Sequence, residues 1–510
     1  MGRFYLTTAI DYANGDPHLG HAFEKIGADA IARYRRLRGD DVHFLIGMDE
    51  HGQKVASEAA DRGVTPQVLV DEVAERFKAM WQRLSISNDQ FMRTTSEEHC
   101  VGVQALIERI FERSPDDFYE KAYEGWYCVG CESFKQDNEI IQGKCILHPT
   151  RTLQWVAEKN WFFRLTAYAD RLRELISGSD FLGPRSRRNE MIALLDQGLE
   201  DISASRSRFS WGVPFPRPSS DGETQTTYVW FDALPNYLTA TGYPAEGFTK
   251  RWPADVHIIG KDITRFHSII WPAMLMAAGL ELPKMVWAHG FVLLAGERFS
   301  KSAGVRLDMN ETIDRYGADA FRYFLLREVP FDADGNFAWE RFEERYNSDL
   351  ANAFGNLASR TIAMIDRYRD GIVPSGSDTE LDRSSAIDLA AYHAAIDGSN
   401  GYLLQDALKA IWQMVFRANE FVDRQAPWKL AKDPANAGEL DRTLGSLARE
   451  LVLQCVHLSP FMPNKCEELW RMLGAPGSVH DVRFETLSSI DPAGWRVAKG
   501  EPLFPKELKV

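Results

Sequence analysis

The sequence of 510 residues contains few cysteines and no long hydrophobic run. Six cysteines in a chain of this length do not form the disulfide framework of a small secreted domain. The longest apolar stretch, around residues 269–280, is too short to cross a bilayer as a helix. The amino-terminal segment MGRFYLTTAIDY has neither the apolar core of a secretory signal nor a myristoylation motif. We therefore expect a cytoplasmic protein that does not associate with membranes.

An excess of positive charge is also absent. The chain has 59 Lys and Arg residues against 73 Asp and Glu residues, which gives a net charge of −14. This balance argues against a protein that coats nucleic acid non-specifically, but it is compatible with a local basic surface. Neither GxxxxGK[ST] nor GxGxxG occurs, so nucleotide sites of those two kinds are excluded. The 45% of hydrophobic residues can fill several cores, and the length predicts about three or four domains.

The first fifty residues predict a strand, a helix and a second strand. Residues 4–10, FYLTTAI, predict a buried strand and are followed by a turn, and Asp16 and Pro17 are suited to the N-cap and the first position of a helix. Apolar residues then repeat at helical spacing from Leu19 to Leu37, until Gly39 ends the helix. Residues 42–46 form the second strand. This arrangement indicates a parallel sheet, whose ligands lie at the carboxyl ends of the strands.

The remaining chain divides by its composition. Residues 114–226 are rich in aromatic residues and turns and interrupt the α/β pattern of residues 1–113, which resumes over residues 227–297. Residues 298–345 contain a loop and a connecting region. From residue 346 to residue 510 the apolar spacing is helical almost throughout. The sequence therefore predicts a split α/β domain followed by an all-α helical bundle.

Two histidines stand where the first helix is expected to begin. His18 and His21 lie at i and i+3 and so share one face of the helix. The start of a helix offers unpaired N–H groups and the positive end of its dipole, which together attract an anion. Gly20 would let a flat ring approach the backbone. Two ordinary surface histidines remain the alternative, whereas a metal pair would need a third ligand that nothing nearby supplies.

A second cationic element is the segment RFSKS, between Gly296 and Gly304. It carries two cations and two hydroxyls, namely Arg298, Lys301, Ser300 and Ser302. A lysine on a flexible loop suits a triphosphate whose charge shifts during a reaction. A solvated basic loop is the alternative.

A cysteine and histidine cluster has the pattern C-x2-C-x13-C-x2-H. Its members are Cys128, Cys131, Cys145 and His148. Two short-spaced pairs of sulfur and nitrogen ligands suit tetrahedral Zn²⁺, and four protein ligands leave no position for water. We therefore expect one structural zinc ion per chain, with unliganded thiols as the alternative.

The helical region contains a polar stripe. Asn352, Asn356 and Arg360 repeat every four residues, and Trp428 follows a proline between two helices. Exposed aromatic, amide and guanidinium groups are the groups that read single-stranded RNA. The alternatives are amides that join helices and a tryptophan that anchors the core.

Seven motifs occur in the order that they have in methionyl-tRNA synthetases, a family of class I aminoacyl-tRNA synthetases. They are YANGDPHLGH, GMDEHG, CVGC, YVWFDALPNY, IIGKDITRFHSIIWPAML, RFSKS and QAPWKLAK, and they span about residues 4–432. The resemblance implies a catalytic Rossmann-like domain in two halves, residues 1–113 and 227–297, split by a zinc-binding insertion. It also implies a KMSKS-type loop with a stem-contact region at residues 298–345 and an anticodon-binding domain at residues 346–510.

The resemblance implies an enzyme that forms methionyl-adenylate from methionine and ATP and then charges tRNA(Met), including the initiator. His18, Gly20, His21 and the RFSKS segment would bind ATP with Mg²⁺, and His18, His21 and Lys301 would be catalytic. RFSKS departs from the family's usual KMSKS, since Arg298 changes the cation geometry and Phe299 replaces a flexible side chain. The absence of an additional carboxyl-terminal tRNA-binding module leads us to expect a monomer.

The resemblance also assigns methionine and anticodon contacts. Asp49 would bind the α-ammonium group, whose charge it matches. The side-chain pocket would involve Ala9, Ile10, Tyr12, Trp230, Ala233, Pro235, Tyr237, Ile263, His267 and Trp271, although aromatic residues are often simply core. Asn352, Asn356, Arg360 and Trp428 would read the CAU anticodon. A synthetase for leucine or valine and a catalytically reduced tRNA-binding protein are the competing hypotheses, and homocysteine could also be activated.

Overall fold

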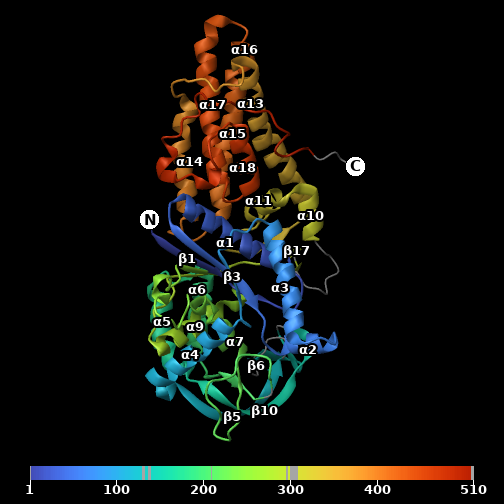
Figure 1. Ribbon diagram of the computed structural model, residues 1–510, viewed down its shortest axis with the longest axis vertical. Helices are drawn as coiled ribbons and strands as arrows, with labels where there is room; N and C mark the ends of the chain where they lie inside the picture. The colour runs from blue at the N-terminus through green and yellow to red at the C-terminus, as the bar shows by residue number, and fades with distance from the viewer. Residues whose placement is uncertain are drawn as a thin grey trace.

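The computed structural model describes residues 2–128, 133–135, 139–146, 148–207, 209–294, 297–298 and 308–506. The chain forms three tiers along its long axis (Figure 1). A helical bundle lies at one end, a parallel sheet flanked by helices lies in the middle, and an antiparallel β region lies at the other end.

The middle tier is built on a parallel sheet. Among the described residues it has seven strands in the order β11-β16-β15-β1-β3-β2, with β4 also paired to β3. These strands are β1 (Arg3–Thr8), β2 (Asp11–Tyr12), β3 (Asp41–Asp49), β4 (Gln90–Arg93), β11 (Leu182–Gly183), β15 (Val256–Gly260) and β16 (Val286–His289). In β1, β15 and β16 nearly every residue is buried, as expected of strands covered on both faces. The predicted parallel α/β domain is confirmed.

Helices cover the sheet and supply the walls of the site. They are α1 (Leu19–Leu37), α2 (Gln53–Asp61), α3 (Pro66–Arg83), α4 (Glu97–Arg113), α5 (Ala169–Gly178), α6 (Arg185–Asp196), α7 (Val229–Ala233), α8 (Asn236–Thr239) and α9 (Trp271–Ala278). The predicted end of α1 is confirmed, because Gly39 has a φ of 86° that only glycine adopts easily. Its predicted start is wrong. The helix begins at Leu19, and the side chain of His18, rather than that of Asp16, caps it.

The antiparallel tier is a long hairpin of β5 (Phe118–Cys128) and β10 (Gln154–Phe163), with β6 (Ser133–Phe134) and β12 (Ile202–Ser203) at its sides. The interval 114–226 is not wholly separate from the α/β domain. Its strand β11 pairs with β16 at the edge of the parallel sheet, through Leu182 and Gly183. A two-residue strand has too little periodicity to be recognised in a sequence, so only the structure reveals this return.

The helical tier confirms the predicted all-α region. It comprises α12 (Trp339–Arg345), a π-helical segment (Tyr346–Gly355), α13 (Asn356–Arg369), α14 (Glu380–Ile396), α15 (Leu404–Gln425), α16 (Pro427–Leu430), α17 (Ala437–Leu458), α18 (Pro463–Met472) and α19 (Phe484–Leu487). Helices α10 (Met309–Tyr316) and α11 (Ala318–Glu328) connect it to the sheet. None of the helices in the described ranges is long and apolar enough to cross a membrane.

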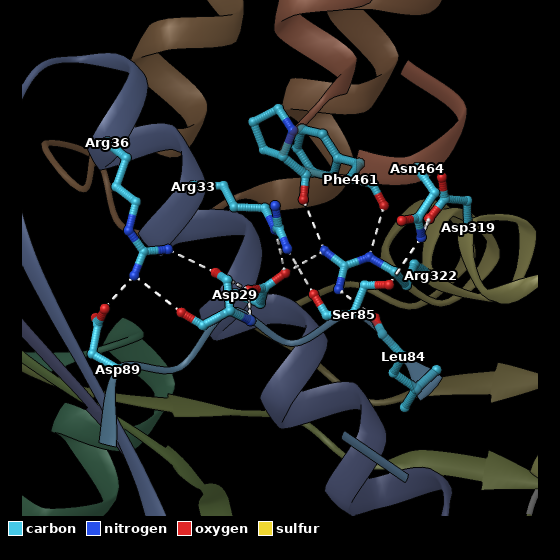
Figure 2. Close-up of polar contacts among 12 residues, drawn as sticks. Asp29, Arg33, Arg36, Leu84, Ser85, Asp89, Asp319, Arg322, Phe461 and Asn464 are labelled. Atoms are coloured by element: carbon cyan, nitrogen blue, oxygen red, sulfur yellow. Dashed lines mark hydrogen bonds and ion pairs between the residues drawn. The ribbon is translucent and has the colours of Figure 1, made fainter. Parts of the chain in front are cut away.

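Arg322 of α11 joins the middle and helical tiers (Figure 2). Its guanidinium donates to Asp29 Oδ2 of α1 at 2.6 Å, and both side chains are fully buried. It also donates to the backbone oxygens of Leu84, Pro460 and Phe461 at 2.9–3.0 Å. One side chain thus connects α1, the segment after α3 and the turn between α17 and α18. The fork of an arginine can make such a set of contacts, because it presents five donors in one plane.

Candidate active site

A cavity of about 740 Å³ opens at the carboxyl ends of the parallel strands. It is lined by residues that follow β1 and β3, by the start of α1, and by the segments around α7, β15 and β16. This is the edge at which parallel sheets bind ligands. Of the predicted site residues, the structure gathers twelve along its walls: Ala9, Ile10, Tyr12, His18, Gly20, His21, Asp49, Trp230, Ala233, Tyr237, Ile263 and His267.

The two histidines lie against one another at the start of α1. Their rings are stacked with centroids 3.6 Å apart. His18 Nδ1 accepts from the amides of Gly20 and His21 at 3.2 and 3.4 Å, and His21 Nδ1 accepts from the His18 amide at 3.4 Å. The expected unpaired amides are therefore partly occupied by His18 itself. Because each Nδ1 accepts, the proton of a neutral ring is on Nε2, which leaves that atom as a donor.

Electrostatics favour a neutral His21. Burial lowers its pKa well below the usual value for histidine, and electrostatic interactions with His18 and Lys25 lower it further. A neutral His21 offers a hydrogen-bond donor at Nε2 rather than a full positive charge. It suits a phosphate oxygen as a directional donor, whereas the main charge neutralisation must come from other groups.

One side of the cavity forms a pocket for an uncharged side chain. Tyr237 and His267 are buried, and the Tyr237 hydroxyl lies 2.7 Å from His267 Nε2. The other nitrogen of His267 donates to the Ile263 backbone oxygen at 3.0 Å, so Nε2 accepts from the tyrosine. Burial lowers the pKa of His267 to about 4 and raises that of Tyr237. Both groups are therefore neutral near pH 7.

Trp230 and Asp49 complete this pocket. The indole of Trp230 is stacked on Phe266, with ring centroids 3.6 Å apart and planes inclined by 8°. Asp49 ends β3, is nearly buried and lines the same cavity. An acidic group beside a neutral aromatic pocket suits an amino acid with an apolar side chain, because the carboxylate matches the ammonium group.

Two predicted pocket residues do not line the cavity. Trp271 is fully buried behind it, where its Nε1 donates to His257 Nε2 at 3.3 Å. Pro235 directly precedes α8, and its neighbour Leu234 lines the cavity instead. Both residues are buried next to residues that line the cavity, Ile270 and Leu234, and so support its wall from behind.

A buried charged network lies beneath the pocket. Lys25 Nζ donates to the Ala9 backbone oxygen, to Asp11 Oδ1 and to Glu24 Oε1, each at 2.8 Å. Glu24 also lies 3.2 Å from His289 Nε2. Burial raises the pKa of Asp11 to about 7, whereas Lys25 keeps the pKa of Glu24 below its usual value despite burial. This network fixes the chain on both sides of the pocket.

Several cavity residues were missed in the sequence. Glu24, Asp11, His289 and Arg206 all line the cavity. The position of Glu24, three residues after His21 on the same helix face, is a signal that could have revealed it. Arg206 is buried, with its guanidinium 4.2 Å from the ring of Tyr228, and it donates to Ser203 Oγ at 2.8 Å. Nothing in the local sequence distinguishes Arg206 from the other arginines around it.

Part of the predicted site lies outside the described residues. This applies to Ser300, Lys301, Ser302 and Cys131, and to the side chains of Arg298 and His148. Cys128 and Cys145 are buried together with Leu153 in one small cluster. The described residues contain no group of three or more His, Cys, Asp or Glu side chains placed to hold a metal ion.

The polar stripe of the helical bundle is exposed at Asn352 and Asn356 and half-buried at Arg360. Asn352 and Asn356 project from the continuous π-helical and α13 segment, and Arg360 lies one turn further on. Arg360 pairs with Asp423 at 2.8 Å and lies 5.7 Å from the ring of Trp428. Trp428 is 38% exposed, on α16 at the far end of the bundle (Figure 1). Arg360 and the ring of Trp428 thus lie side by side, and the two amides are on the preceding turns of the helix that carries Arg360.

A family model for class I tRNA synthetases (M) matches residues 4–152 and 140–362 of the chain. The chain belongs to this family. The methionine–tRNA ligase of Caldanaerobacter subterraneus subsp. tengcongensis is 45% identical over 99% of the chain and 78% of its own length. That of Bacillus subtilis is 43% identical with the same two coverages. A solved structure of Mycobacterium tuberculosis methionyl-tRNA synthetase in complex with methionyl-adenylate is also similar, with a TM-score of 0.93 and 38% identity over 99% of this chain and 100% of that one. Membership of this family gives the chain a known type of reaction, for which the cavity is the candidate site.

Proposed function

We infer that this chain ligates methionine to tRNA in two steps. Methionine and ATP first form methionyl-adenylate and pyrophosphate, and the methionyl group then passes to the 3′ end of tRNA with release of AMP. The observation that carries this inference is the cavity itself, where Asp49, a neutral aromatic pocket and the stacked histidines meet at the carboxyl edge of the sheet. The relatives at 42–45% identity are methionine–tRNA ligases, which supports the same substrate.

In the first step, a methionine carboxylate oxygen attacks the α-phosphorus, and the bond from that phosphorus to the bridging oxygen of pyrophosphate breaks. Such a reaction depends mainly on positioning and on charge stabilisation. His18 and His21 would donate through Nε2 to phosphate oxygens, with Gly20 allowing close approach of the nucleotide. Lys301, assisted by Arg298, Ser300 and Ser302, would stabilise the departing pyrophosphate. Mg²⁺ bound with ATP would supply further positive charge on the phosphates.

The methionine pocket would use charge at one end and polarisable rings at the other. Asp49 would bind the ammonium group. The thioether would lie among Ala9, Ile10, Tyr12, Trp230, Ala233, Tyr237, Ile263 and His267, with Pro235 and Trp271 behind them. Contacts between sulfur and an aromatic ring contribute about 0.3–1.5 kcal/mol each. Tyr237 and His267 bond to each other, and burial lowers the pKa of His267 to about 4, so these two groups offer no charge to a bound side chain.

The exposed stripe would read the CAU anticodon of tRNA(Met), in both initiator and elongator forms. Trp428 can stack on an unpaired base, and Asn352, Asn356 and Arg360 can bind base edges. This role fits residues 346–510, while residues 1–113 and 227–297 would provide catalysis and residues 298–345 would contact the tRNA stem. We further propose that the enzyme acts as a cytoplasmic monomer.

A zinc ion held by Cys128, Cys131, Cys145 and His148 would stabilise the tip of residues 114–226. The surroundings of Cys128 and Cys145 fit a zinc site. The cluster around Cys128 and Cys145 contains just one other buried residue, Leu153, and one partly buried neighbour, Ile140, within the described chain. So small a core needs an additional cross-link, which a tetrahedral metal site provides.

A charging assay tests the proposed function. The chain is incubated with ATP, radiolabelled methionine and two tRNA transcripts that differ only in the anticodon, CAU or another triplet. We expect methionylation of the CAU transcript and little of the other. Activation of methionine without transfer to either transcript would contradict the second step, and charging of both at equal rates would contradict the anticodon assignment.

A further inference from the structure

Three segments meet at the carboxylate of Asp232. This residue is fully buried in α7, and its Oδ2 lies 2.6 Å from His51 Nδ1 in the segment after β3. Its Oδ1 lies 2.9 Å from His99 Nε2, in the first turn of α4. An ionised carboxylate only accepts hydrogen bonds, so both histidine nitrogens carry protons. His51, Asp232 and His99 form what we call the carboxylate clamp.

The clamp lies just behind the cavity. None of its three members lines the cavity, but Trp230 and Ala233 on either side of Asp232 do. Asp49, two residues before His51 and at the end of β3, lines the same cavity. The clamp is thus a direct link between α7 and the end of β3, two walls of the cavity that would contact the amino acid.

Helix α7 depends on such a link for its position. It is five residues long, and so short a helix is not stable by itself. His99 also contacts α8, the helix that follows α7, because its Nδ1 lies 2.9 Å from Thr239 Oγ1. The position of α7 is therefore set by side chains from outside it.

The segment that carries His51 is fixed from several directions. The Glu50 amide donates to Thr94 Oγ1 at 3.0 Å, and Trp211 Nε1 donates to the Glu50 backbone oxygen at 2.7 Å. Arg93 pairs with the Glu50 carboxylate at 2.6 Å. His51 therefore connects α7 to a rigid point next to Asp49.

Charge strengthens the connection. Burial by itself would raise the pKa of Asp232, but the charge and hydrogen bond of His51 and the hydrogen bond of His99 lower it to about 2. Burial by itself would lower the pKa of His51, but Asp232 produces a net rise. The two groups thus form a charge-assisted hydrogen bond in a buried place, where such bonds are strong.

We propose that His51 and Asp232 are positioning residues for the amino acid substrate, which hold Trp230 and Ala233 of α7 at a fixed distance from Asp49. This inference rests on the proposed function, because it assumes that the amino acid lies between these walls. The clamp acts through residues that touch the substrate and does not touch it itself. Loosening it should therefore weaken methionine binding more than ATP binding or the chemical step.

The test is methionine-dependent exchange of pyrophosphate into ATP, measured without tRNA on the full chain. His51→Leu removes the donor, whereas His51→Asn places an amide nitrogen near the position of Nδ1. We expect His51→Leu to raise the KM for methionine about tenfold or more, since small misplacements at a site are costly. The KM for ATP and kcat should change less than about threefold, and His51→Asn should recover most of the loss. Asp232→Asn keeps the side-chain volume and should show the same change in the KM for methionine as His51→Leu. It provides a second test if His51→Leu folds poorly.

Ser385→Ala is the matched control. It removes the donor of a 2.8 Å bond to the buried carboxylate of Glu450, in the helical bundle. We expect it to lower thermal stability without changing either KM. Equal increases in both KM values for His51→Leu, or no recovery with His51→Asn, would overturn the positioning role. Methionine-dependent exchange by the unmodified chain tests the proposed function separately, so the two failures are distinguishable.

Discussion

Removal of Arg322 should weaken the connection between the α/β domain and the helical bundle. In Arg322→Ala, Asp29 loses one partner and keeps Arg33 and Ser87, which donate to it at 2.6–2.8 Å. The backbone oxygens of Leu84, Pro460 and Phe461 lose their arginine donor (Figure 2). These groups are held together by one fully buried side chain.

The expected cost is large. Breaking a buried ion pair by removal of one partner costs about 3–5 kcal/mol. Since Asp29 retains other donors, we expect the lower part of that range for the pair, with an additional loss from the three carbonyl groups. Arg33→Ala is the matched control, because Arg33 also pairs with Asp29 at 2.8 Å but is 15% exposed and bonds to one carbonyl group. We expect it to cost about 1 kcal/mol.

Differential scanning calorimetry measures the effect. A chain of several domains need not unfold in one step, so the number of transitions is as informative as their midpoints. Arg322→Ala should lower the midpoint well below that of Arg33→Ala and should separate the unfolding of the bundle from that of the sheet. An Arg322→Ala midpoint equal to that of Arg33→Ala, with one unchanged transition, would refute the role assigned to this side chain.

Four further predictions concern the site and the bundle. His21→Ala should lower the rate of methionine activation at least tenfold. His21→Gln should recover part of this rate, because the glutamine amide can replace the Nε2 donor. Equal rates for wild type and His21→Ala in single-turnover adenylate formation would contradict the histidine's role. Trp428→Ala should lower charging of CAU-anticodon tRNA and leave pyrophosphate exchange nearly intact, whereas equal losses in the two assays would make Trp428 a core residue. Removal of zinc by a chelator should lower the thermal midpoint, with zinc content read by atomic absorption, and a metal-free purified chain would refute the site. Burial raises the pKa of Glu450 to about 7, so the folded state binds its proton more tightly than the unfolded state. The free energy of unfolding should therefore fall as the pH rises from about 4.5 to 7, by on the order of 1–3 kcal/mol. Glu450→Gln should remove this fall in melting curves recorded from about pH 5 to pH 8.

The fold was accessible from the sequence where local patterns are long. Helix α1 repeats its apolar residues over five turns, and β1 is a short run of apolar and threonine residues followed by a turn, so the sequence predicts both elements. The start of α1 was misplaced because Asp16 and Pro17 are better helix-starting residues than His18 by preference alone. The structure uses His18 because its ring stacks on that of His21 and bonds to two amides, an interaction that preferences of single residues do not include.

The site was accessible in part. Asp49, His18 and Tyr237 occur in recognisable motifs, and all three line one cavity. Arg206 and His289 come from distant parts of the chain, and only the folded sheet brings them to the same place. The clamp at Asp232 was not accessible, because a buried ion pair between residues 181 positions apart leaves no periodic signal in the sequence.

The most direct test of the central claim is pyrophosphate exchange with each of the twenty amino acids, in the absence of tRNA. Asp49 and a neutral, sulfur-compatible aromatic pocket should make methionine the best substrate by kcat/KM. Discrimination against apolar amino acids that differ by about one methylene group should correspond to about 1–3 kcal/mol or more. Exchange driven best by leucine or valine would contradict the pocket assignment, and absence of exchange with every amino acid would contradict the catalytic role of the cavity.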